Sequence, residues 1–177
     1  MATQTGEEAL GTVSRFLDAT MCQERVVELV NQAKGLVYVL AYTFDCWALV
    51  EALIGAKQRG CDVRIGIDRR FLKGGTCREM LPCCKKLVAH GVWTVTMSGG
   101  SLRSAYESVG RAAVGGPGIQ HSKCALVDGI LVHGSTNWTA ASRGNLELSS
   151  EVVLTKKGRE EVEQLLKGRL PKGEFLM

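Results

Sequence analysis

The 177-residue chain lacks several features that would place it in a special structural class. It has three prolines, 6% aromatic residues, no internal repeat and no low-complexity tract, which argues against a fibrous or repeat protein. No apolar run reaches the roughly 20 residues of a membrane-spanning helix. The first residues form neither a basic segment nor a long apolar stretch. We therefore expect a globular protein without a transmembrane segment, signal peptide or transit peptide.

The seven cysteines lack the spacing of a disulfide framework or a zinc site. Their number is odd, which favours reduced thiols in an intracellular, cytoplasmic protein. One grouping could suggest zinc, namely Cys77, Cys83, Cys84 and His90. It contains no Cys-x2-Cys pair and falls on a predicted helix, whose turn would scatter the side chains. We expect no metal and no cofactor.

Basic residues are concentrated in the middle of the chain. The net charge is +4, yet the segment from Gly55 to Lys123 holds twelve basic and four acidic residues. Such a segment favours an anionic partner, such as nucleic acid or a lipid headgroup, although a solvated basic face is the simpler alternative.

The hydrophobic pattern alternates between helix and strand through one domain, expected at 21–170 between an N-terminal extension (1–20) and a C-terminal tail (171–177). The expected elements of the first half are helix 21–33, strand 36–44, helix 47–59, strand 62–67, helix 77–89 and strand 92–96. After a glycine-rich loop at 98–118 we expect strands 119–127 and 130–133, a short helix at 137–143, strand 146–154 and helix 157–166. This order predicts an α/β fold with a mixed, largely parallel β-sheet sandwiched between helices.

Four polar side chains converge around the predicted hairpin, whose turn is Asp128-Gly129. His121 and Lys123 point the same way because strand side chains alternate between faces, and the return strand ends near them with Ser135 and Asn137. An imidazole can attack phosphorus or deliver a proton, and the ammonium and carboxamide suit phosphate oxygens. The simpler alternative is a hairpin with an incidental His and Lys.

The spacing His121-x-Lys123-x4-Asp128, followed by Gly134-Ser135-x-Asn137, resembles the HKD signature of the phospholipase D (PLD) superfamily. Val39–Phe44, Gly60–Asp68 and Asn145-Leu-Glu147 resemble flanking elements of that family. Five residues separate Asp128 from Gly134, one fewer than the commonest spacing. The chain also lacks the N-terminal membrane helix and the zinc-binding insertion of the mitochondrial members.

The resemblance implies a role for each signature residue. His121 is either the nucleophile that forms a phosphohistidine or the second histidine of the reaction, which acts as general acid. Lys123 and Asn137 hold the phosphate with help from Ser135, and Glu147 orients the imidazole. Asp128 belongs to the signature, but it lies on the opposite strand face from His121 by parity, which indicates a structural turn residue.

The resemblance further implies a metal-independent phosphodiesterase of the single-HKD type. Its two-imidazole reaction predicts a homodimer sharing one active site, since the chain has only one signature histidine. The basic segment favours an endonuclease acting on a nucleic-acid backbone. We expect this segment to form a groove that leads to His121 and is lined by Arg103 and Arg111. One alternative is a hydrolase of cardiolipin or another phospholipid, which would allow a location at the mitochondrial surface. Another is a catalytically silent dimer that binds nucleic acid or protein.

Overall fold

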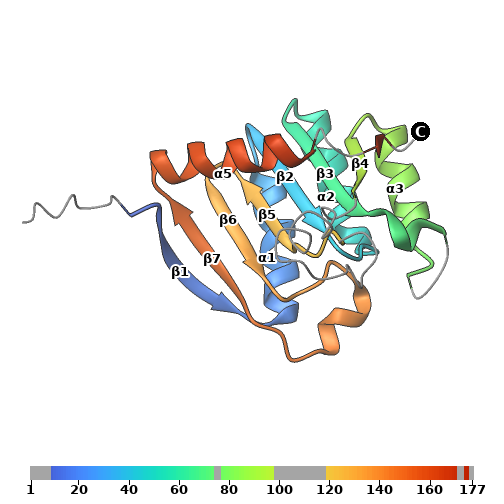
Figure 1. The fold of residues 1–177 in the computed structure, drawn as a ribbon, viewed down its shortest axis with the longest axis horizontal. Coiled ribbons are helices and arrows are strands. Elements are labelled where there is room, and N and C mark those ends of the chain that lie inside the picture. Colours follow the sequence, from blue (N-terminus) through green and yellow to red (C-terminus); the bar gives the residue numbers. More distant parts are fainter. Residues whose placement is uncertain (1–8, 74–76, 98–118, 171–173, 176–177) are drawn as a thin grey trace, which may run out of the picture.

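A computed structural model places the chain in one mixed sheet with helices on both faces (Figure 1). The structure describes residues 9–73, 77–97, 119–170 and 174–175. Their eight strands lie in the order β1-β7-β6-β5-β2-β3-β4-β8. The strands are β1 (Gly11–Leu17), β2 (Leu36–Ala41), β3 (Asp62–Asp68), β4 (Trp93–Met97), β5 (Cys124–Val127), β6 (Ile130–Gly134), β7 (Ser149–Leu154) and β8 (Glu174–Phe175). The helices are α1 (Ala19–Gln32), α2 (Trp47–Gln58), α3 (Met80–Ala89) and α5 (Lys156–Arg169), with short 3-10 helices η1 (Arg69–Lys73) and η2 (Ala140–Gly144).

The sheet is parallel over the three neighbouring strands β2, β3 and β4 and antiparallel elsewhere. Strand β2 is buried along its whole length, as its continuous apolar sequence predicts, and pairs in parallel with β3, which pairs in parallel with β4. The other five neighbouring pairs are antiparallel. The expected mixed sheet is confirmed, but its parallel part is limited to three strands. The reason is that the hairpin β5–β6 and the strands β1, β7 and β8 all join through antiparallel pairs.

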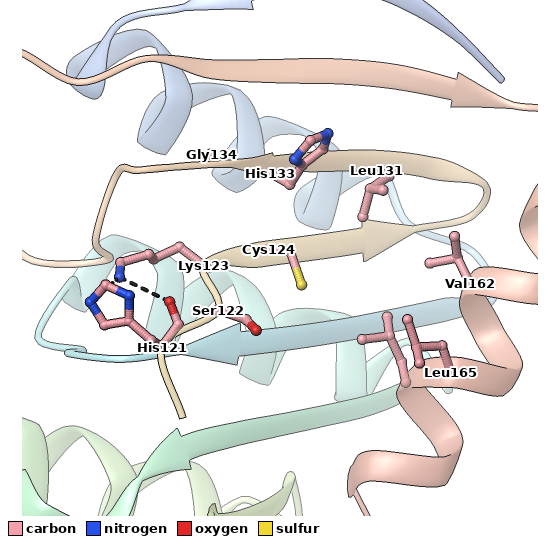
Figure 2. A pocket seen from close by; sticks show the side chains of 10 residues that line it. His121, Ser122, Lys123, Cys124, Leu131, His133, Gly134, Val162 and Leu165 are labelled. Carbon is pink, nitrogen blue, oxygen red and sulfur yellow. Dashed lines mark hydrogen bonds between the residues drawn. The ribbon is translucent and has the colours of Figure 1, made fainter. Parts of the chain in front are cut away.

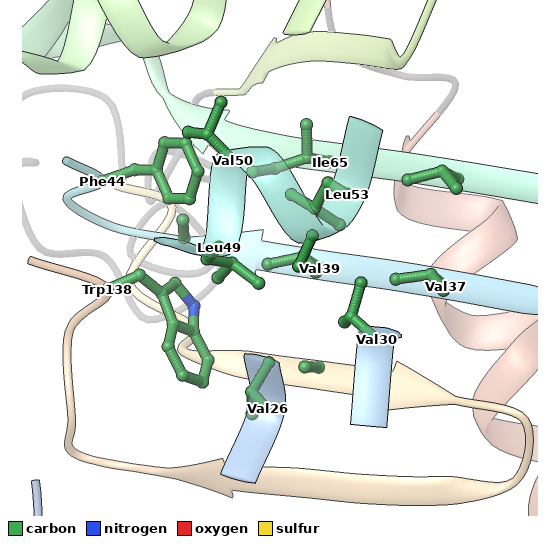
Figure 3. Close-up of a cluster of buried hydrophobic side chains, with 14 of the residues drawn as sticks. Val26, Val30, Val37, Val39, Phe44, Leu49, Val50, Leu53, Ile65 and Trp138 are labelled. Atoms are coloured by element: carbon green, nitrogen blue, oxygen red, sulfur yellow. The ribbon is translucent and has the colours of Figure 1, made fainter. Parts of the chain in front are cut away.

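Helices α1, α2 and α3 cover one face of the sheet, where the larger core lies. Figure 3 shows Val26 and Val30 of α1 and Leu53 of α2 packed against Val39 of β2 and Ile65 of β3. Helix α5 covers part of the other face through Leu166, which packs with buried residues of β2 and β5. The predicted arrangement of a sheet between helices is therefore confirmed.

The turn at Asp128-Gly129 joins β5 to β6 with positive φ angles of 46° and 96°. Two positive φ angles are typical of a type I′ turn, which matches the twist of a hairpin. The Asp128 carboxylate accepts backbone N–H groups from Lys34 at 2.7 Å, Gly35 at 3.1 Å and Leu36 at 2.7 Å. Asp128 thus connects the turn to the beginning of β2.

Several element boundaries differ from the sequence-based expectations. Strand β5 begins at Cys124, so His121 and Lys123 lie on the extended segment that leads into it. Within the region expected to be an extension, Gly11–Leu17 forms edge strand β1 and pairs with β7. A short exposed strand whose partner is distant in sequence carries little local signal.

All seven cysteines are free, as expected. In the described ranges no group of three or more His, Cys, Asp or Glu side chains is arranged to hold a metal ion. None of the helices in these ranges is long and apolar enough to cross a bilayer.

Candidate active site

The candidate site lies where β2 and β3 end and the chain enters β5. Strands β2 and β3 run in parallel, so their carboxyl ends lie at the same edge of the sheet. Tyr42 directly follows β2, and Asp68 is the last residue of β3. Strand β5 runs antiparallel to β2, which brings its first residues to that edge. His121 and Lys123 therefore meet Tyr42 and Asp68 although they are far apart in sequence.

His121 and Lys123 are in direct contact (Figure 2). The Nζ atom of Lys123 lies 2.9 Å from Nε2 of His121 and 2.9 Å from the carbonyl oxygen of the same residue. The Lys123 side chain is largely buried, with 8% of the residue exposed. An ammonium only donates, so Nε2 accepts in this pair and the ring proton is assigned to Nδ1. The geometry presents a neutral imidazole with its lone pair on Nε2.

The electrostatic surroundings favour that neutral form. Burial lowers the pKa of His121, and the positive charges of Lys123 and Arg70 lower it further, while Asp68 acts in the opposite direction. Burial also lowers the pKa of Lys123, which the negative charge of Glu147 partly offsets. An unprotonated imidazole is the form that can act as a nucleophile.

Tyr42 lies between the basic groups of the site. Its ring meets the His121 ring edge-on, with centroids 4.5 Å apart and an angle of 67° between the planes. Lys123 Nζ lies 4.8 Å from the Tyr42 centroid, and the Arg70 guanidinium carbon 5.6 Å from it. Arg70 also donates to the Tyr42 hydroxyl at 3.3 Å. One aromatic ring thus contacts both cations and the imidazole.

Asp68 connects β3 to the segment that carries His121. Its side chain is fully buried; Oδ2 accepts the backbone N–H of Gln120 at 2.9 Å, and Oδ1 accepts the backbone and Nε groups of Arg70 at 3.0 and 2.9 Å. Gln120 directly precedes His121, so this carboxylate fixes the backbone that presents the imidazole. Tyr42, Asp68 and Arg70 were not predicted from the sequence as site residues. Their position at the carboxyl ends of predicted parallel strands was the available signal.

Ser135 and Asn137 follow β6 towards the same edge of the sheet. The Ser135 hydroxyl accepts the backbone N–H of Leu148 at 3.1 Å. The side-chain oxygen Oδ1 of Asn137 is buried and has no hydrogen-bond partner among the described residues. An amide oxygen only accepts, so a contact from Asn137 to a phosphate oxygen would have to come from its Nδ2.

Glu147 accepts a hydrogen bond from Asn145 Nδ2 at 3.2 Å. Its negative charge raises the pKa of Lys123, against the larger effect of burial. Within the described ranges, no hydrogen bond connects His121 with Ser135, Asn137 or Glu147, so the roles expected for these three residues stay predictions.

Comparison with known proteins assigns this arrangement to a family. Residues 26–168 match the family described as "Cardiolipin synthase, PLD-like domain". The chain belongs to this PLD-like family. The resemblance drawn from the HKD spacing is thereby confirmed.

Two curated relatives are similar over most of the chain. It is 26% identical to the mitochondrial cardiolipin hydrolase of Xenopus tropicalis over 146 residues, which cover 80% of this chain and 59% of that protein. It is 29% identical to a phospholipase D of Rickettsia felis (strain ATCC VR-1525 / URRWXCal2) over 156 residues, covering 88% and 66%. The PLD-like chain thus spans about three fifths to two thirds of the length of these relatives.

Solved structures show the same fold. The phospholipase D family member Nuc from Salmonella typhimurium superposes with a TM-score of 0.73 at 24% identity, covering 94% of this chain and 98% of Nuc. NucT from Helicobacter pylori superposes with a TM-score of 0.70 at 15% identity, covering 92% and 98%. The expected PLD-like fold is confirmed.

The PLD-like signature is therefore divided between two places in the fold. His121 and Lys123 occupy the candidate site, whereas Asp128 lies at the opposite end of β5, in the hairpin turn. Arg103 and Arg111, expected to bind substrate, lie outside the described residues.

Proposed function

We propose that this PLD-like chain hydrolyses phosphodiesters and that Nε2 of His121 attacks phosphorus. The 2.9 Å contact between Lys123 Nζ and His121 Nε2 carries the proposal. It holds the imidazole in the tautomer that a nucleophile needs, and it places a cation where a phosphate would lie. An incoming phosphate oxygen would accept from the ammonium and so free Nε2 for attack.

In the proposed reaction, Nε2 forms a bond to phosphorus while the bond from phosphorus to the leaving oxygen breaks. A second imidazole donates a proton to that oxygen. Water then attacks the phosphohistidine, the second imidazole takes a proton from the water, and the P–N bond breaks to return His121. Lys123 and Asn137 would bind the non-bridging oxygens, with Ser135 assisting, as the family resemblance implies.

The second imidazole would come from another copy of the chain. The sequence holds three histidines, and the two besides His121 each lie close to a hydrogen-bonding group of their own. His90 directly follows α3 as its C-cap, with its Nδ1 2.9 Å from the carbonyl oxygen of Lys86, and His133 lies on β6 with its Nε2 3.2 Å from the Ser150 hydroxyl. A twofold axis at the site would bring two His121 side chains together, with at least about 1,200 Å² buried in total. A fully active monomer in sedimentation at nanomolar concentration would contradict this dimer.

Two substrate classes have support. The basic segment of the sequence favours a nucleic-acid backbone, and Arg70 and Lys123 do supply positive charge at the site. Other cations of that segment are engaged elsewhere, since Arg64 pairs with Asp62 and Lys86 with Glu51. An apolar cavity beside His121 favours a phospholipid.

In the experiment, the purified chain is incubated in excess chelator with one of two substrates. These are a labelled single-stranded oligonucleotide and cardiolipin vesicles, assayed in parallel. We expect hydrolysis of a phosphodiester without added metal and its loss in His121→Ala and His121→Asn. Losing both nucleophile and acid–base chemistry should cost more than the roughly 10²–10⁴-fold of acid–base help alone. More than about a tenth of wild-type activity in either variant, when folded, would exclude His121 as the nucleophile.

A further inference from the structure

The segment 136–140, which follows β6, carries Asn137 and is anchored to the end of β2. Trp138 lies in the larger core (Figure 3), and its Nε1 donates to the carbonyl oxygen of Leu40 at 3.0 Å. The carbonyl oxygen of Trp138 accepts the backbone N–H of Asp45 at 2.9 Å. The residue next to Asn137 is thereby fixed through both its side chain and its backbone.

Gln23 of α1 holds the same segment through two backbone carbonyl groups. Its Nε2 donates to the carbonyl oxygen of Asn137 at 2.9 Å and to that of Thr139 at 2.8 Å. Carbonyl oxygens only accept, which assigns the NH₂ end of the carboxamide to them. The Oε1 atom of Gln23 accepts Nε of Arg143 at 3.2 Å. Both hydrogens of this carboxamide are thus used on the backbone around Asn137.

The burial of Gln23 shows that a polar side chain is needed at this point of α1. Only 2% of the residue is exposed, and burying a carboxamide costs free energy unless it is hydrogen-bonded. The other buried residues of α1 are small or apolar, namely Ala19, Cys22, Val26, Leu29 and Val30. A helix that only packed against the core would carry an apolar residue here as well. The carboxamide of Gln23 therefore serves the segment that it binds.

The backbone of Asn137 is fixed on both sides. Thr136, which precedes it, is buried, and its Oγ1 lies 2.9 Å from Oγ of Ser149 in β7. Gln23 fixes the peptide group that follows Asn137, because the carbonyl oxygen it binds belongs to that peptide. The Asn137 side chain can then move only by rotation about its own bonds. Its Oδ1 is buried, so Nδ2 is the atom that can donate to a phosphate oxygen.

Resting on the proposed phosphodiesterase function, we infer that Gln23 is a positioning residue for the phosphate contact of Asn137. Its carboxamide holds the segment 136–140 so that Nδ2 of Asn137 meets a non-bridging oxygen as negative charge develops there. Without the two donors of Gln23 the segment can shift. A displacement of about 1 Å at a group that contacts the reacting phosphate costs about 10²-fold in rate.

The test measures kcat/KM for bis(p-nitrophenyl) phosphate in excess chelator. Gln23→Met keeps the length of the side chain and removes both donors, so each folded preparation should lose about 10- to 100-fold in kcat/KM. Arg143→Met is the milder second variant, because it removes the donor to Oε1 and its side chain is 46% exposed. We expect Arg143→Met to fold and to lower kcat/KM about threefold. Circular dichroism verifies folding.

Tyr38→Phe is the matched control. Tyr38 is fully buried, and the variant removes its hydrogen bond to Asp62 at the start of β3. Because this bond is distant from the segment 136–140, kcat/KM should change less than about twofold.

Asn137→Ala separates a positioning role from a merely structural one. Alone, it should lower kcat/KM about 10²–10³-fold, the usual effect of losing one donor to the transition state. If Gln23 acts through Asn137, adding Gln23→Met or Arg143→Met to Asn137→Ala should cost less than about twofold more. The same fold-loss with and without Asn137→Ala would overturn the positioning role, as would wild-type kcat/KM in both Gln23→Met and Arg143→Met.

Binding of inorganic phosphate tests the same link without turnover. Phosphate should shift the NMR signals of the Asn137 side-chain amide in the wild type. The midpoint of this titration should rise about tenfold in Gln23→Met and stay unchanged in Tyr38→Phe. Absence of the shift in the wild type, or an unchanged midpoint in Gln23→Met, would overturn the inference and leave the phosphodiesterase intact.

Failure of the proposed function has a different signature. It would be overturned if the wild type hydrolysed neither bis(p-nitrophenyl) phosphate nor the oligonucleotide nor the cardiolipin vesicles. The phosphate titration would still decide whether Gln23 positions Asn137.

Discussion

Replacing Asp68 with asparagine tests whether this buried carboxylate positions the His121 segment. The carboxylate accepts three hydrogen bonds, two from Arg70 and one from the backbone N–H of Gln120. Asparagine keeps the shape but replaces one acceptor oxygen by a donor. If its oxygen stays with Arg70, its amide nitrogen faces the Gln120 N–H, and two donors then meet in a site that is fully buried.

The expected cost follows from that mismatch. A hydrogen bond to a charged group contributes about 1.5–3 kcal/mol, and a buried donor without an acceptor costs about 1–3 kcal/mol more, with overlap between the two. We expect Asp68→Asn to lower the free energy of unfolding by about 3 kcal/mol. For a chain of this size, that corresponds to roughly 6–12 °C in Tm. Because Gln120 precedes His121, a shift of about 1 Å would also lower kcat/KM about 10²-fold.

Urea unfolding followed by circular dichroism gives the stability, and bis(p-nitrophenyl) phosphate gives kcat/KM at a temperature where the variant is folded. Asp62→Asn is the matched control, since Asp62 accepts from Arg64 and Tyr38 at the other end of β3 and is partly exposed. It should cost less than about 1 kcal/mol and leave kcat/KM unchanged. A folded Asp68→Asn with wild-type stability and wild-type kcat/KM would refute the positioning role.

Three further predictions concern the site and its hairpin. The lowered pKa of His121 means that the neutral imidazole persists to lower pH. NMR titration of its ring protons should therefore give a midpoint below 6.5, and this midpoint should rise in Lys123→Met. A midpoint at or above 6.5 in the wild type would contradict the lowered pKa. Tyr42→Phe keeps the ring and should change kcat/KM less than about threefold. Tyr42→Leu removes the contacts between the ring and the cations and should lower kcat/KM about tenfold or more. Equal losses of kcat/KM in the two variants would assign the role of Tyr42 to its hydroxyl. Asp128→Ala loses three hydrogen bonds and places alanine at a positive φ, so urea unfolding should show a loss of about 2–4 kcal/mol in the free energy of unfolding. A loss below about 0.5 kcal/mol would show that the turn does not depend on Asp128.

Local patterns in the sequence were sufficient for much of the fold. The apolar run at Leu36 and the alternation after Asp62 each carry their own signal for a strand, and Asp128-Gly129 carries one for a hairpin. The helices around them follow from the 3.6-residue period, although the predicted ends shift by a few residues. The strand expected from residue 119 begins only at Cys124.

The rest of the site depends on contacts between distant segments. The hydrogen bond from Gln120 to Asp68 joins residues 52 positions apart, and the Tyr42 ring meets His121 from the end of a different strand. No local pattern reports such a pair. The HKD spacing indicated His121 and Lys123. The residues that position them, Tyr42 and Asp68, could be identified only once the order of the strands in the sheet was known.

The pairing of β1 with β7 has a consequence for how the chain folds during synthesis. Ser14 of β1 donates to Glu151 of β7, 137 positions later, and Arg25 of α1 binds the same buried carboxylate. At translation rates of roughly 5–20 residues per second, β1 therefore waits about 7–27 s for its partner strand. During that time Val13 and Phe16 belong to an unpaired strand, a template for wrong pairing between nascent chains. Occupation of β1 by a chaperone over this interval would protect the nascent chain until β7 leaves the ribosome.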